Sequence, residues 1–340
     1  MDKELMSARE MRGNTEMHLQ NKERKLISIV MPAMNEEENL PRAYKEVTEV
    51  FSQLPDYGYE VIVIDNDSTD KTADVCASIC AQDMKWKYVK FSRNFTSEIS
   101  IAAGLRLAKG DAVIILFSDL QDPPRLIPEF IKKWEEGYDV VCGLLSKRAD
   151  DTWWKTLGAK SIYWLLNRLS DIKIPPHVVD FRLMSRPVVN AVNKLDERNR
   201  YFRGLSHWAG FKTCTVPYER RPRLKGKSAA SFFYLIDFTL RALTSFSITP
   251  LRIFSGLGWI LLGFAVVYMI ISLGYFFFGH TVPGLTTVII LLLFNLAFIS
   301  LGIGALGEYI GRIYMETKRR PLWVIEKNLN ITISDEERFG

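Results

Sequence analysis

The chain has few of the residues that build disulfide frameworks or zinc sites. Its 340 residues include four cysteines and four histidines. Cys76 and Cys80 are four residues apart, and Cys142 and Cys214 are far from them in the sequence. This spacing excludes zinc-ribbon and thioredoxin-like motifs and predicts reduced thiols in a cytosolic domain. The first residues also lack an apolar run behind their charges, so we expect no cleaved signal peptide.

Glycine-rich phosphate cradles are missing where they would be needed. No G-x-G-x-x-G fingerprint follows the first expected strand, and the sequence contains no P-loop. A bound nucleotide would therefore be held by side chains and a metal ion rather than by a glycine-rich loop. The net charge of +5 is small for this length and gives no sign of a nucleic-acid partner.

Charge is almost absent from two long stretches near the C-terminus. Ile253–Phe278 contains no charged residue, and Leu285–Leu306 is interrupted only by the polar Asn295. Each stretch is long enough to cross a hydrocarbon core of about 30 Å. The connection Gly279–Gly284 carries no Lys or Arg, whereas both flanks do. This pattern predicts a two-helix transmembrane hairpin with both termini cytoplasmic. The alternative is a pair of buried helices in a soluble protein.

These stretches divide the chain. We expect a flexible tail over residues 1–24, a folded domain over 25–227, interfacial amphipathic helices over 228–250, two transmembrane helices within 251–312 and a cytoplasmic tail over 313–340. The interfacial segment is rich in Phe, Leu and Ile but contains Asp237 and Arg241, which makes it too polar to span a membrane. Asp151–Ser170, with aromatic residues beside Lys and Arg, suits either the membrane interface or a core helix.

The folded domain alternates β-branched runs with helical patterns. The expected strands are Leu26–Met31, Val61–Ile64 and Val113–Phe117, and the expected helices are Glu37–Phe51, Thr69–Ala81 and Ser97–Ala108. This alternation predicts an α/β fold with a parallel, doubly wound sheet. Ligands bind such sheets beyond the carboxyl ends of the strands. Polar residues follow all three strands, namely Asn35, Glu36, Asp65, Asp67, Asp119, Gln121 and Asp122. For Asp67 and Asp70, helix capping is the structural alternative.

Five short motifs carry a resemblance to a known family. They are PAMNE at Pro32–Glu36, VID at Val63–Asp65, SRNF at Ser92–Phe95, SDLQDPP at Ser118–Pro124 and DFRLM at Asp180–Met184. Together they resemble the second glycosyltransferase family, and within it the polyprenyl-phosphate glycosyltransferases, such as dolichol-phosphate mannose synthases and bactoprenol glucosyltransferases. The ending LGEYIGR at Leu306–Arg312, followed by the basic Lys318–Arg320, is similar to the bactoprenol branch. The resemblance covers roughly Leu26–Val324.

The resemblance implies a GT-A (Rossmann-like) fold, a UDP- or GDP-linked sugar donor, and Mg²⁺ or Mn²⁺. It places Asp119 and Gln121 at the metal, and Asp180 and Asp119 at the catalytic centre. The residues implied for nucleotide-sugar binding are Pro32, Asn35, Glu36, Asp65, Asp67, Arg93, Ser118 and Asp119. Those implied for the acceptor phosphate are Arg200, Arg203, Arg223 and Lys227. A homo-oligomer, specifically a tetramer, is also implied.

The chain departs from the family pattern at four places. The family has Asp two residues before Asp119, where this chain has Phe117. The usual Asp-Asp-Gly-Ser is Asp65-Asn66-Asp67-Ser68, and the usual Gly with Lys or His after Arg-Asn-Phe is Thr96-Ser97. Val178-Val179 replaces a pair that ends in Gly before Asp180. Three of these departures lie in the half expected to bind the donor.

The chemistry of a phosphate acceptor sets the expected reaction. Its second pKa is about 6, so it attacks the anomeric carbon without prior deprotonation. Asp180 then has three candidate roles: to orient an acceptor-binding Arg, to bind the metal, or to assist a monoanionic acceptor. A salt bridge with Arg182 or Arg186 is the structural alternative. A single in-line displacement predicts inversion. The Arg- and Lys-rich cluster over 200–227 suits either the acceptor phosphate or lipid headgroups.

The sequence therefore predicts a glycosyltransferase that loads a sugar onto undecaprenyl or dolichyl phosphate in the cytoplasmic membrane, for cell-envelope glycan such as O-antigen modification. One alternative is transfer to another lipid, such as a diacylglycerol. A second alternative, motivated by Phe117 and Asn66, is a catalytically weak membrane scaffold of the same fold.

Overall fold

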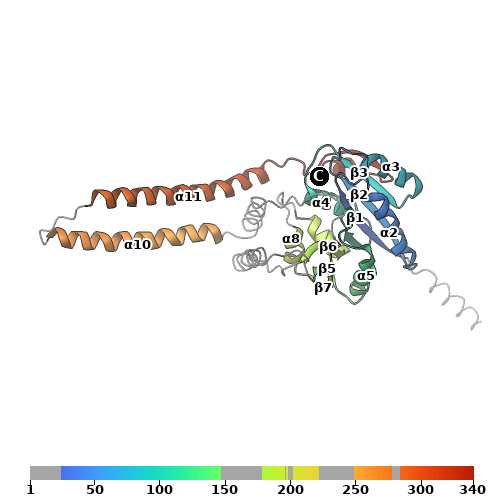
Figure 1. The fold of residues 1–340 in the computed structure, drawn as a ribbon, viewed down its shortest axis with the longest axis horizontal. Coiled ribbons are helices and arrows are strands. Elements are labelled where there is room, and N and C mark those ends of the chain that lie inside the picture. Colours follow the sequence, from blue (N-terminus) through green and yellow to red (C-terminus); the bar gives the residue numbers. More distant parts are fainter. Residues whose placement is uncertain (1–23, 147–177, 196, 198–201, 222–248, 278–283) are drawn as a thin grey trace, which may run out of the picture.

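The computed structural model describes residues 24–146, 178–195, 197, 202–221, 249–277 and 284–340. These residues form an α/β domain from which two long helices extend side by side (Figure 1). The predictions for the N-terminal tail up to residue 23, for Asp151–Ser170 and for the interfacial segment up to residue 248 lie outside this description.

The eight strands are β1 (Lys25–Ala33), β2 (Tyr57–Asp65), β3 (Trp86–Phe91), β4 (Ala112–Ile115), β5 (Val140–Leu145), β6 (Val178–Ser185), β7 (Thr213–Tyr218) and β8 (Ile325–Leu329). The domain helices are α2 (Leu40–Ser52), α3 (Thr72–Gln82), α4 (Ser97–Leu107), the 3₁₀ turn η1 (Pro124–Leu126), α5 (Ile127–Glu135), α7 (Arg186–Asn193), α8 (Phe202–Trp208) and α12 (Asp335–Arg338). The extending pair are α10 (Thr249–Phe277) and α11 (Leu285–Thr317). The three predicted strands and three predicted helices are all present, with bounds shifted by a few residues.

The strands form one mixed sheet in the order β7-β5-β6-β4-β1-β2-β3-β8. β1 pairs in parallel with both β2 and β4, and β2 pairs in parallel with β3. The prediction of a parallel sheet is correct for this half, and β5 and β7 also pair in parallel, but the other pairings are antiparallel. β6 runs antiparallel between β4 and β5, and β8 runs antiparallel to β3. The described residues therefore form an α/β fold with a mixed sheet.

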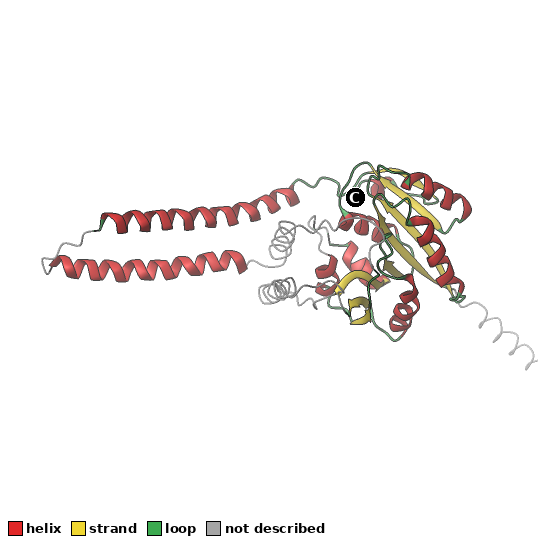
Figure 2. Cartoon of the chain, in the orientation of Figure 1, coloured by secondary structure: helices red, strands yellow, loops and turns green. Residues whose placement is uncertain are grey.

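Helices cover both faces of the sheet, because alternate residues of the strands bury apolar side chains on each side (Figure 2). On one face, the core includes Leu40 and Val47 of α2, Ile79 of α3 and Phe130 of α5. On the other face, α4 packs over β1 and β2, and α7 and α8 pack over β6, in a second apolar cluster that includes Val30 and Ile62. Strand residues such as Ile29 and Ile114 have no exposed surface. This two-sided burial explains the near-continuous apolar runs of β1, β2 and β4.

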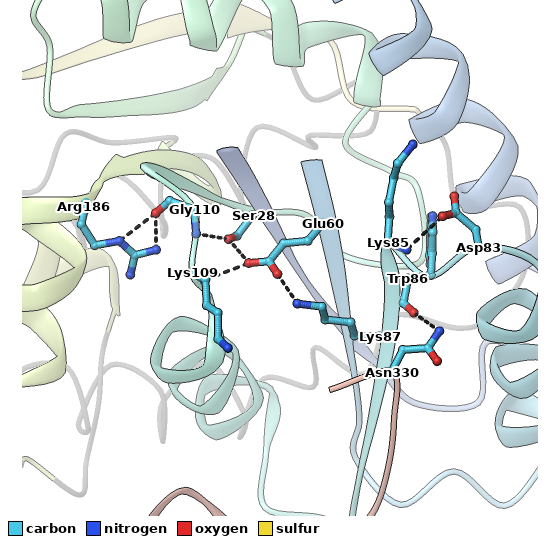
Figure 3. A network of polar contacts seen from close by, with 10 residues as sticks. All are labelled: Ser28, Glu60, Asp83, Lys85, Trp86, Lys87, Lys109, Gly110, Arg186 and Asn330. Atoms are coloured by element: carbon cyan, nitrogen blue, oxygen red, sulfur yellow. Dashed lines mark hydrogen bonds and ion pairs between the residues drawn. The ribbon is translucent and has the colours of Figure 1, made fainter. Parts of the chain in front are cut away.

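A buried polar network lies near the amino ends of β1, β2 and β3 (Figure 3). Ser28 Oγ donates to Glu60 Oε1 at 2.5 Å, and the backbone N–H of Lys109 donates to the same oxygen at 2.8 Å. Lys87 forms an ion pair with the other carboxylate oxygen. Gly110 N–H donates to Ser28 Oγ at 2.8 Å. The network thus joins three strands to the turn between α4 and β4. It lies at the amino ends of the strands, opposite the polar loops that follow their carboxyl ends.

The two extending helices carry exposed apolar side chains on much of their surface. Trp259 and Phe264 on α10 are 74% and 70% exposed, and Leu301 on α11 is 64% exposed. The rings of Phe254 and Phe298 lie 5.9 Å apart between the helices. Among the described residues, one helical segment, Phe294–Thr317, has the length and apolar composition of a membrane span, and α10 contains the shorter apolar stretch Gly256–Tyr268. The two-span hairpin therefore stays a prediction.

The chain returns from α11 to the domain. The sequence predicts a tail after residue 312, whereas the structure continues α11 to Thr317 and then adds β8 to the sheet beside β3. Trp323 is 1% exposed, and its Nε1 donates to the carbonyl of Glu337 at 2.9 Å. Asn330 Nδ2 donates to the carbonyls of Cys80 and Trp86. Both ends of the helical pair are thus connected to the same α/β domain.

Candidate active site

The loops after β1 and β4 lie at the point where the strand order reverses. The chain proceeds from β1 outward to β2 and β3, then crosses to β4 on the other side of β1. Such a switch point opens a crevice beyond the carboxyl ends of the two strands, where ligands of open α/β sheets bind. Ser118, after β4, donates from Oγ to the carbonyl of Pro32 on β1 at 2.9 Å. The predicted Pro32–Glu36 and Ser118–Gln121 segments therefore meet at one edge of the sheet.

The loops after β1 and β2 are joined by hydrogen bonds. Asn35 N–H donates to Ser68 Oγ at 2.9 Å, and Asn35 Oδ1 accepts from Thr69 N–H at 2.8 Å. Glu36 N–H donates to Thr72 Oγ1 at 2.8 Å. Asn35 is exposed and Glu36 is partly exposed. The two predicted nucleotide-binding residues are thus placed at the surface by a preformed loop pair.

Asp65 is fully buried at the end of β2 and fixes the following turn. Its Oδ1 accepts from the N–H and Oγ of Ser68 at 2.8 and 2.6 Å. Its Oδ2 accepts from the hydroxyl of Tyr88 at 2.6 Å. Burial and the adjacent Asp65 raise the pKa of Tyr88, so this hydroxyl stays protonated and donates. In this arrangement Asp65 orders the loop that would face a nucleoside, and its own contact with the nucleoside stays a prediction.

Asn66 connects the loops after β2 and β3. Its Nδ2 donates to Asn94 Oδ1 at 2.8 Å, and its Oδ1 accepts from the N–H of Phe95 at 2.8 Å. The side-chain amide thus serves as donor and acceptor at once, which a carboxylate cannot do. Nearby, the exposed Arg93 places its guanidinium 4.2 Å from the ring centre of Phe95. The departure at Asn66 therefore has a structural role in shaping the site.

Asp67 and Lys90 extend the site towards the C-terminal strand. Lys90 Nζ lies 3.7 Å from Asp67 Oδ1 and 2.9 Å from Glu326 Oε2 on β8. Hydrogen bonding to Glu326 raises the pKa of Lys90, which favours its charged form. Asp67 is thus connected through one lysine to the segment that follows α11, a connection that the sequence did not predict.

The turn after β4 carries the residues predicted at the metal. Asp119 is partly exposed, and its Oδ1 accepts from the N–H of Gln121 at 3.2 Å. Gln121 is 7% exposed and Leu120 is 2% exposed. Phe117, which stands where the family has Asp, packs against the apolar cluster under α4. The turn therefore carries one partly exposed carboxylate at this edge of the sheet, next to buried neighbours.

Four loops at this edge each contain a non-glycine residue with positive φ. Asn35, Asp67, Thr96 and Leu120, which follow β1, β2, β3 and β4, have φ values of 58°, 65°, 89° and 52°. Such conformations cost about 1–3 kcal/mol each and persist where the surroundings fix them. Thr96 has ψ 157°, in a region that is essentially reserved for glycine. The family's glycine at this position is therefore explained by the backbone that Thr96 adopts here.

Asp180 reaches the same edge because β6 runs antiparallel to β4. The pairing of Ile115 with Arg182 brings the beginning of β6 to the carboxyl end of β4. Asp180 Oδ1 lies 3.8 Å from Nη2 of Arg182, which is fully buried and donates to the carbonyl of Val179 at 2.8 Å. The salt bridge with Arg182, which is the structural alternative to a functional role, is thus present, while Asp180 keeps 24% of its side chain exposed.

The residues predicted for the acceptor phosphate lie mostly outside the described part of the chain. Arg203 is on α8, and Arg200, Arg223 and Lys227 are not described. Two other basic residues of the same cluster have carboxylate partners. Arg220 pairs with Asp122, and Arg221 pairs with Glu46 on α2. These two arginines are therefore already matched by negative charge.

The side-chain oxygens of this turn fit a divalent cation whose coordination shell is completed by substrate. Among the described residues, no group of three or more His, Cys, Asp or Glu side chains is placed to bind a metal. Mg²⁺ usually takes one or two protein carboxylates and completes its shell with substrate phosphates and water. The partly exposed carboxylate of Asp119, with the oxygen-bearing Gln121 two residues on, matches that chemistry.

Comparison with known proteins gives one consistent result. The family model described as "Glycosyl transferase family 2" matches residues 28–192. A glycosyltransferase of Synechocystis sp. is 39% identical over 300 residues, which cover 88% of this chain and 94% of that protein. A prophage bactoprenol glucosyl transferase homolog of Escherichia coli is 40% identical over 304 residues, covering 88% and 98%. An SfII prophage-derived bactoprenol glucosyl transferase of Shigella flexneri is 40% identical over 305 residues, covering 89% and 98%.

Proposed function

The chain belongs to glycosyl transferase family 2, and we propose that it transfers a sugar from a nucleotide-sugar to a polyprenyl phosphate at the cytoplasmic face of a membrane. The observation that carries the proposal is the meeting of the Asn35–Glu36 loop, the Asp119 turn and Asp180 at the switch point of the sheet. The similarity to bactoprenol glucosyl transferases over nearly their whole length supports the acceptor class.

The donor binds across the switch point in this proposal. Loops after β1 and β2 contact the nucleoside, and the turn after β4 faces the diphosphate. Asp119 and Gln121 hold Mg²⁺ or Mn²⁺, which when bound supplies positive charge against the departing diphosphate. The preformed hydrogen bonds between the loops reduce the entropy that donor binding must offset.

The transfer step needs no general base at the acceptor. An oxygen of the acceptor phosphate forms a bond to the anomeric carbon, and the bond from that carbon to the nucleoside diphosphate breaks. The phosphate is largely dianionic near neutral pH, since its second pKa is about 6. A single displacement of this kind inverts the anomeric configuration. The partly exposed Asp180, oriented by the buried Arg182, is suited to positioning the incoming acceptor or its binding arginine.

The membrane part of the proposal rests on α10 and α11. Both helices expose large apolar side chains, and in water such surfaces are unfavourable. Basic residues flank the pair, with Arg252 near its start and Lys318–Arg320 after its end, and the connection between them carries none. Two spans with both termini cytoplasmic agree with this distribution. A lipid acceptor would then approach beside the domain that holds the donor.

A donor panel tests the proposal. Purified full-length protein is incubated with undecaprenyl phosphate, Mg²⁺ or Mn²⁺ and labelled UDP- or GDP-sugars. We expect one donor to give a labelled lipid that mild acid hydrolyses, with inverted configuration at the anomeric carbon. A labelled lipid that resists mild acid indicates another acceptor, such as diacylglycerol. The absence of transfer with every donor would support the scaffold alternative.

A further inference from the structure

A buried carboxylate next to the Asp119 turn is held by the last residue of β7 and by a residue that follows this strand. Asp122 is 1% exposed. Arg220 Nε donates to its Oδ1 at 3.0 Å, and Arg220 Nη2 donates to its Oδ2 at 3.1 Å. The hydroxyl of Tyr218 also donates to Oδ1. Asp122 therefore accepts a two-pronged arginine contact and a tyrosine contact, all from a segment about one hundred residues further along the chain.

The backbone adds a second connection between the same two segments. Arg221 N–H donates to the carbonyl of Gln121 at 3.0 Å. The Arg221 guanidinium donates to both carboxylate oxygens of Glu46 on α2 at 3.0 and 2.8 Å. The segment after β7 is thus attached to the Asp119 turn through two successive residues, Gln121 and Asp122.

The charges of Asp122 and Arg220 explain why the contact between the two segments is stable. A carboxylate without exposed surface is stable only when it is paired and hydrogen-bonded, and loss of one partner leaves the other buried and unmatched. Burial disfavours the charged form of Arg220, but Asp122 outweighs that effect and raises the pKa of Arg220. Burial and Asp122 also raise the pKa of Tyr218, which keeps its hydroxyl as a donor. The negative charge of Asp119 acts on both residues in the same direction.

The turn needs such support because its own backbone is strained. Leu120 has φ 52°, in the left-handed region that residues with a branched side chain seldom adopt. Asp119 precedes this residue and Gln121 follows it, so their relative placement depends on the turn keeping that conformation. A contact that fixes Asp122 fixes the end of the turn.

We propose that Asp122, Tyr218 and Arg220 form a positioning clamp, which sets the geometry of the Asp119–Gln121 turn for a divalent cation and a nucleoside diphosphate. The proposal rests on the function proposed above and adds positioning residues to it. The clamp also connects that turn to the carboxyl end of β7. Arg220 is then a structural partner of Asp122 and not a contact for lipid headgroups.

The test uses full-length protein in detergent or nanodiscs, with UDP and GDP as probes. Mn²⁺-dependent binding of each nucleotide is measured by titration calorimetry, and KM and kcat are measured for donor and acceptor. Asp122→Asn keeps the shape but removes the charge. We expect its affinity for Mn²⁺ with nucleotide to fall about 10- to 100-fold, as for other supporting residues of metal sites. For Asp122→Asn, the KM for the sugar donor should rise, and the KM for the lipid acceptor should equal that of the wild type. Arg220→Lys keeps the charge but loses the two-pronged contact. Its affinity for Mn²⁺ with nucleotide should lie between those of the wild type and Asp122→Asn.

Further measurements separate positioning from general destabilisation. Raising the Mn²⁺ concentration should restore the kcat of Asp122→Asn, and a far-UV circular dichroism spectrum of this variant without metal that equals the wild-type spectrum shows that the variant is folded. Glu129→Gln, an exposed carboxylate change on α5, should bind like the wild type. If Asp122→Asn does not fold, Tyr218→Phe, which loses one hydroxyl, decides the question by the same affinity measurement.

Two results would contradict the clamp, and they differ in whether the proposed function is contradicted as well. Wild-type protein that binds the nucleotides, together with folded clamp variants of unchanged affinity, contradicts the clamp alone. Wild-type protein that binds neither nucleotide with any divalent cation contradicts the proposed function and the clamp together.

Discussion

Asn66 and Asn94 share a hydrogen bond of 2.8 Å between two loops of the site, with Asn66 as donor. The acceptor oxygen of Asn94 also receives the N–H of Thr96 at 3.0 Å, which fixes the orientation of the Asn94 amide. The contact therefore requires a donor at position 66. It explains why this chain has Asn where the family pattern has Asp.

The Asn66→Asp change should destabilise the protein, although it restores the family residue. A carboxylate would face the Asn94 oxygen and leave that contact without a donor. We expect a loss of about 1–3 kcal/mol in the free energy of unfolding, the cost of an unmatched buried polar group. Denaturant unfolding measures it, with Asn190→Asp on the exposed face of α7 as the control. Equal stability of Asn66→Asp and wild type would show that the bond contributes nothing.

The Thr96→Gly change should stabilise the protein. Thr96 has φ 89° and ψ 157°, which glycine adopts without steric strain. Relief of the strain should contribute about 1–2 kcal/mol, reduced by the greater freedom of glycine in the unfolded chain. A thermal unfolding scan checks this. The adjacent Ser97→Gly, inside α4, should instead lower the melting temperature; a lowered melting temperature for Thr96→Gly would refute the strain argument.

The Glu60 network predicts a pH-dependent stability. Burial alone would raise the pKa of Glu60, but Lys87, Ser28 and the Lys109 amide outweigh it, so the pKa is lowered in the folded state. The contribution of Glu60 is therefore complete above the unfolded value of about 4.3 and is lost as the pH falls through the lower folded value. Glu60→Gln should cost about 1–3 kcal/mol near neutral pH, because the partly buried Lys87 loses its carboxylate partner.

The measurement is denaturant unfolding of wild type and Glu60→Gln across a pH series. The stability difference should shrink as the pH falls below about 4. The exposed pair Lys133–Glu136 supplies the control, since Glu136→Gln should have little effect at any pH. A Glu60→Gln difference that is independent of pH in acid would contradict the network.

The C-terminal segment should be part of the folded domain. Trp323 is 1% exposed and belongs to the apolar cluster that includes β3 residues. Trp323→Ala should therefore cost about 3–5 kcal/mol in the free energy of unfolding. Phe339→Ala, at a ring that is 53% exposed, should cost much less. A loss for Trp323→Ala as small as that expected for the exposed Phe339 would show that β8 and its surroundings do not contribute to the domain core.

The sequence predicted the half of the sheet in which each strand is marked by its own residues. β1, β2 and β4 are apolar and β-branched, so the sequence predicted these strands correctly, and the polar residues that follow them mark the edge where a ligand is expected. β3 contains Lys87 and Lys90 among its six residues, and β8 is short and polar. Their positions depend on pairing and on buried ion contacts, which composition does not reveal. The antiparallel insertion of β6 between β4 and β5 likewise has no local signature.

In the site, too, the sequence predicted the residues that have a local signal and missed those that act over a long distance in the chain. Asn35, Asp119 and Asp180 were predicted from strand ends and family motifs, and the structure brings their segments to one edge of the sheet. Tyr218 and Glu326 were missed, because each acts on a loop far away in the sequence. Arg220 belongs to a basic cluster that the sequence assigns to either the acceptor phosphate or lipid headgroups, and its contact with the buried Asp122 could only be seen in three dimensions.

Transfer by wild type and Asp119→Asn, measured side by side, tests the central claim most directly. Full-length protein in nanodiscs receives the preferred labelled nucleotide-sugar, a divalent cation and undecaprenyl phosphate. The wild type should form labelled lipid, and Asp119→Asn, which keeps the shape of the turn, should lose about 100-fold or more of the rate. Asp111→Asn, an exposed carboxylate change at the opposite end of β4, should retain transfer. Equal rates for wild type and Asp119→Asn would contradict the account.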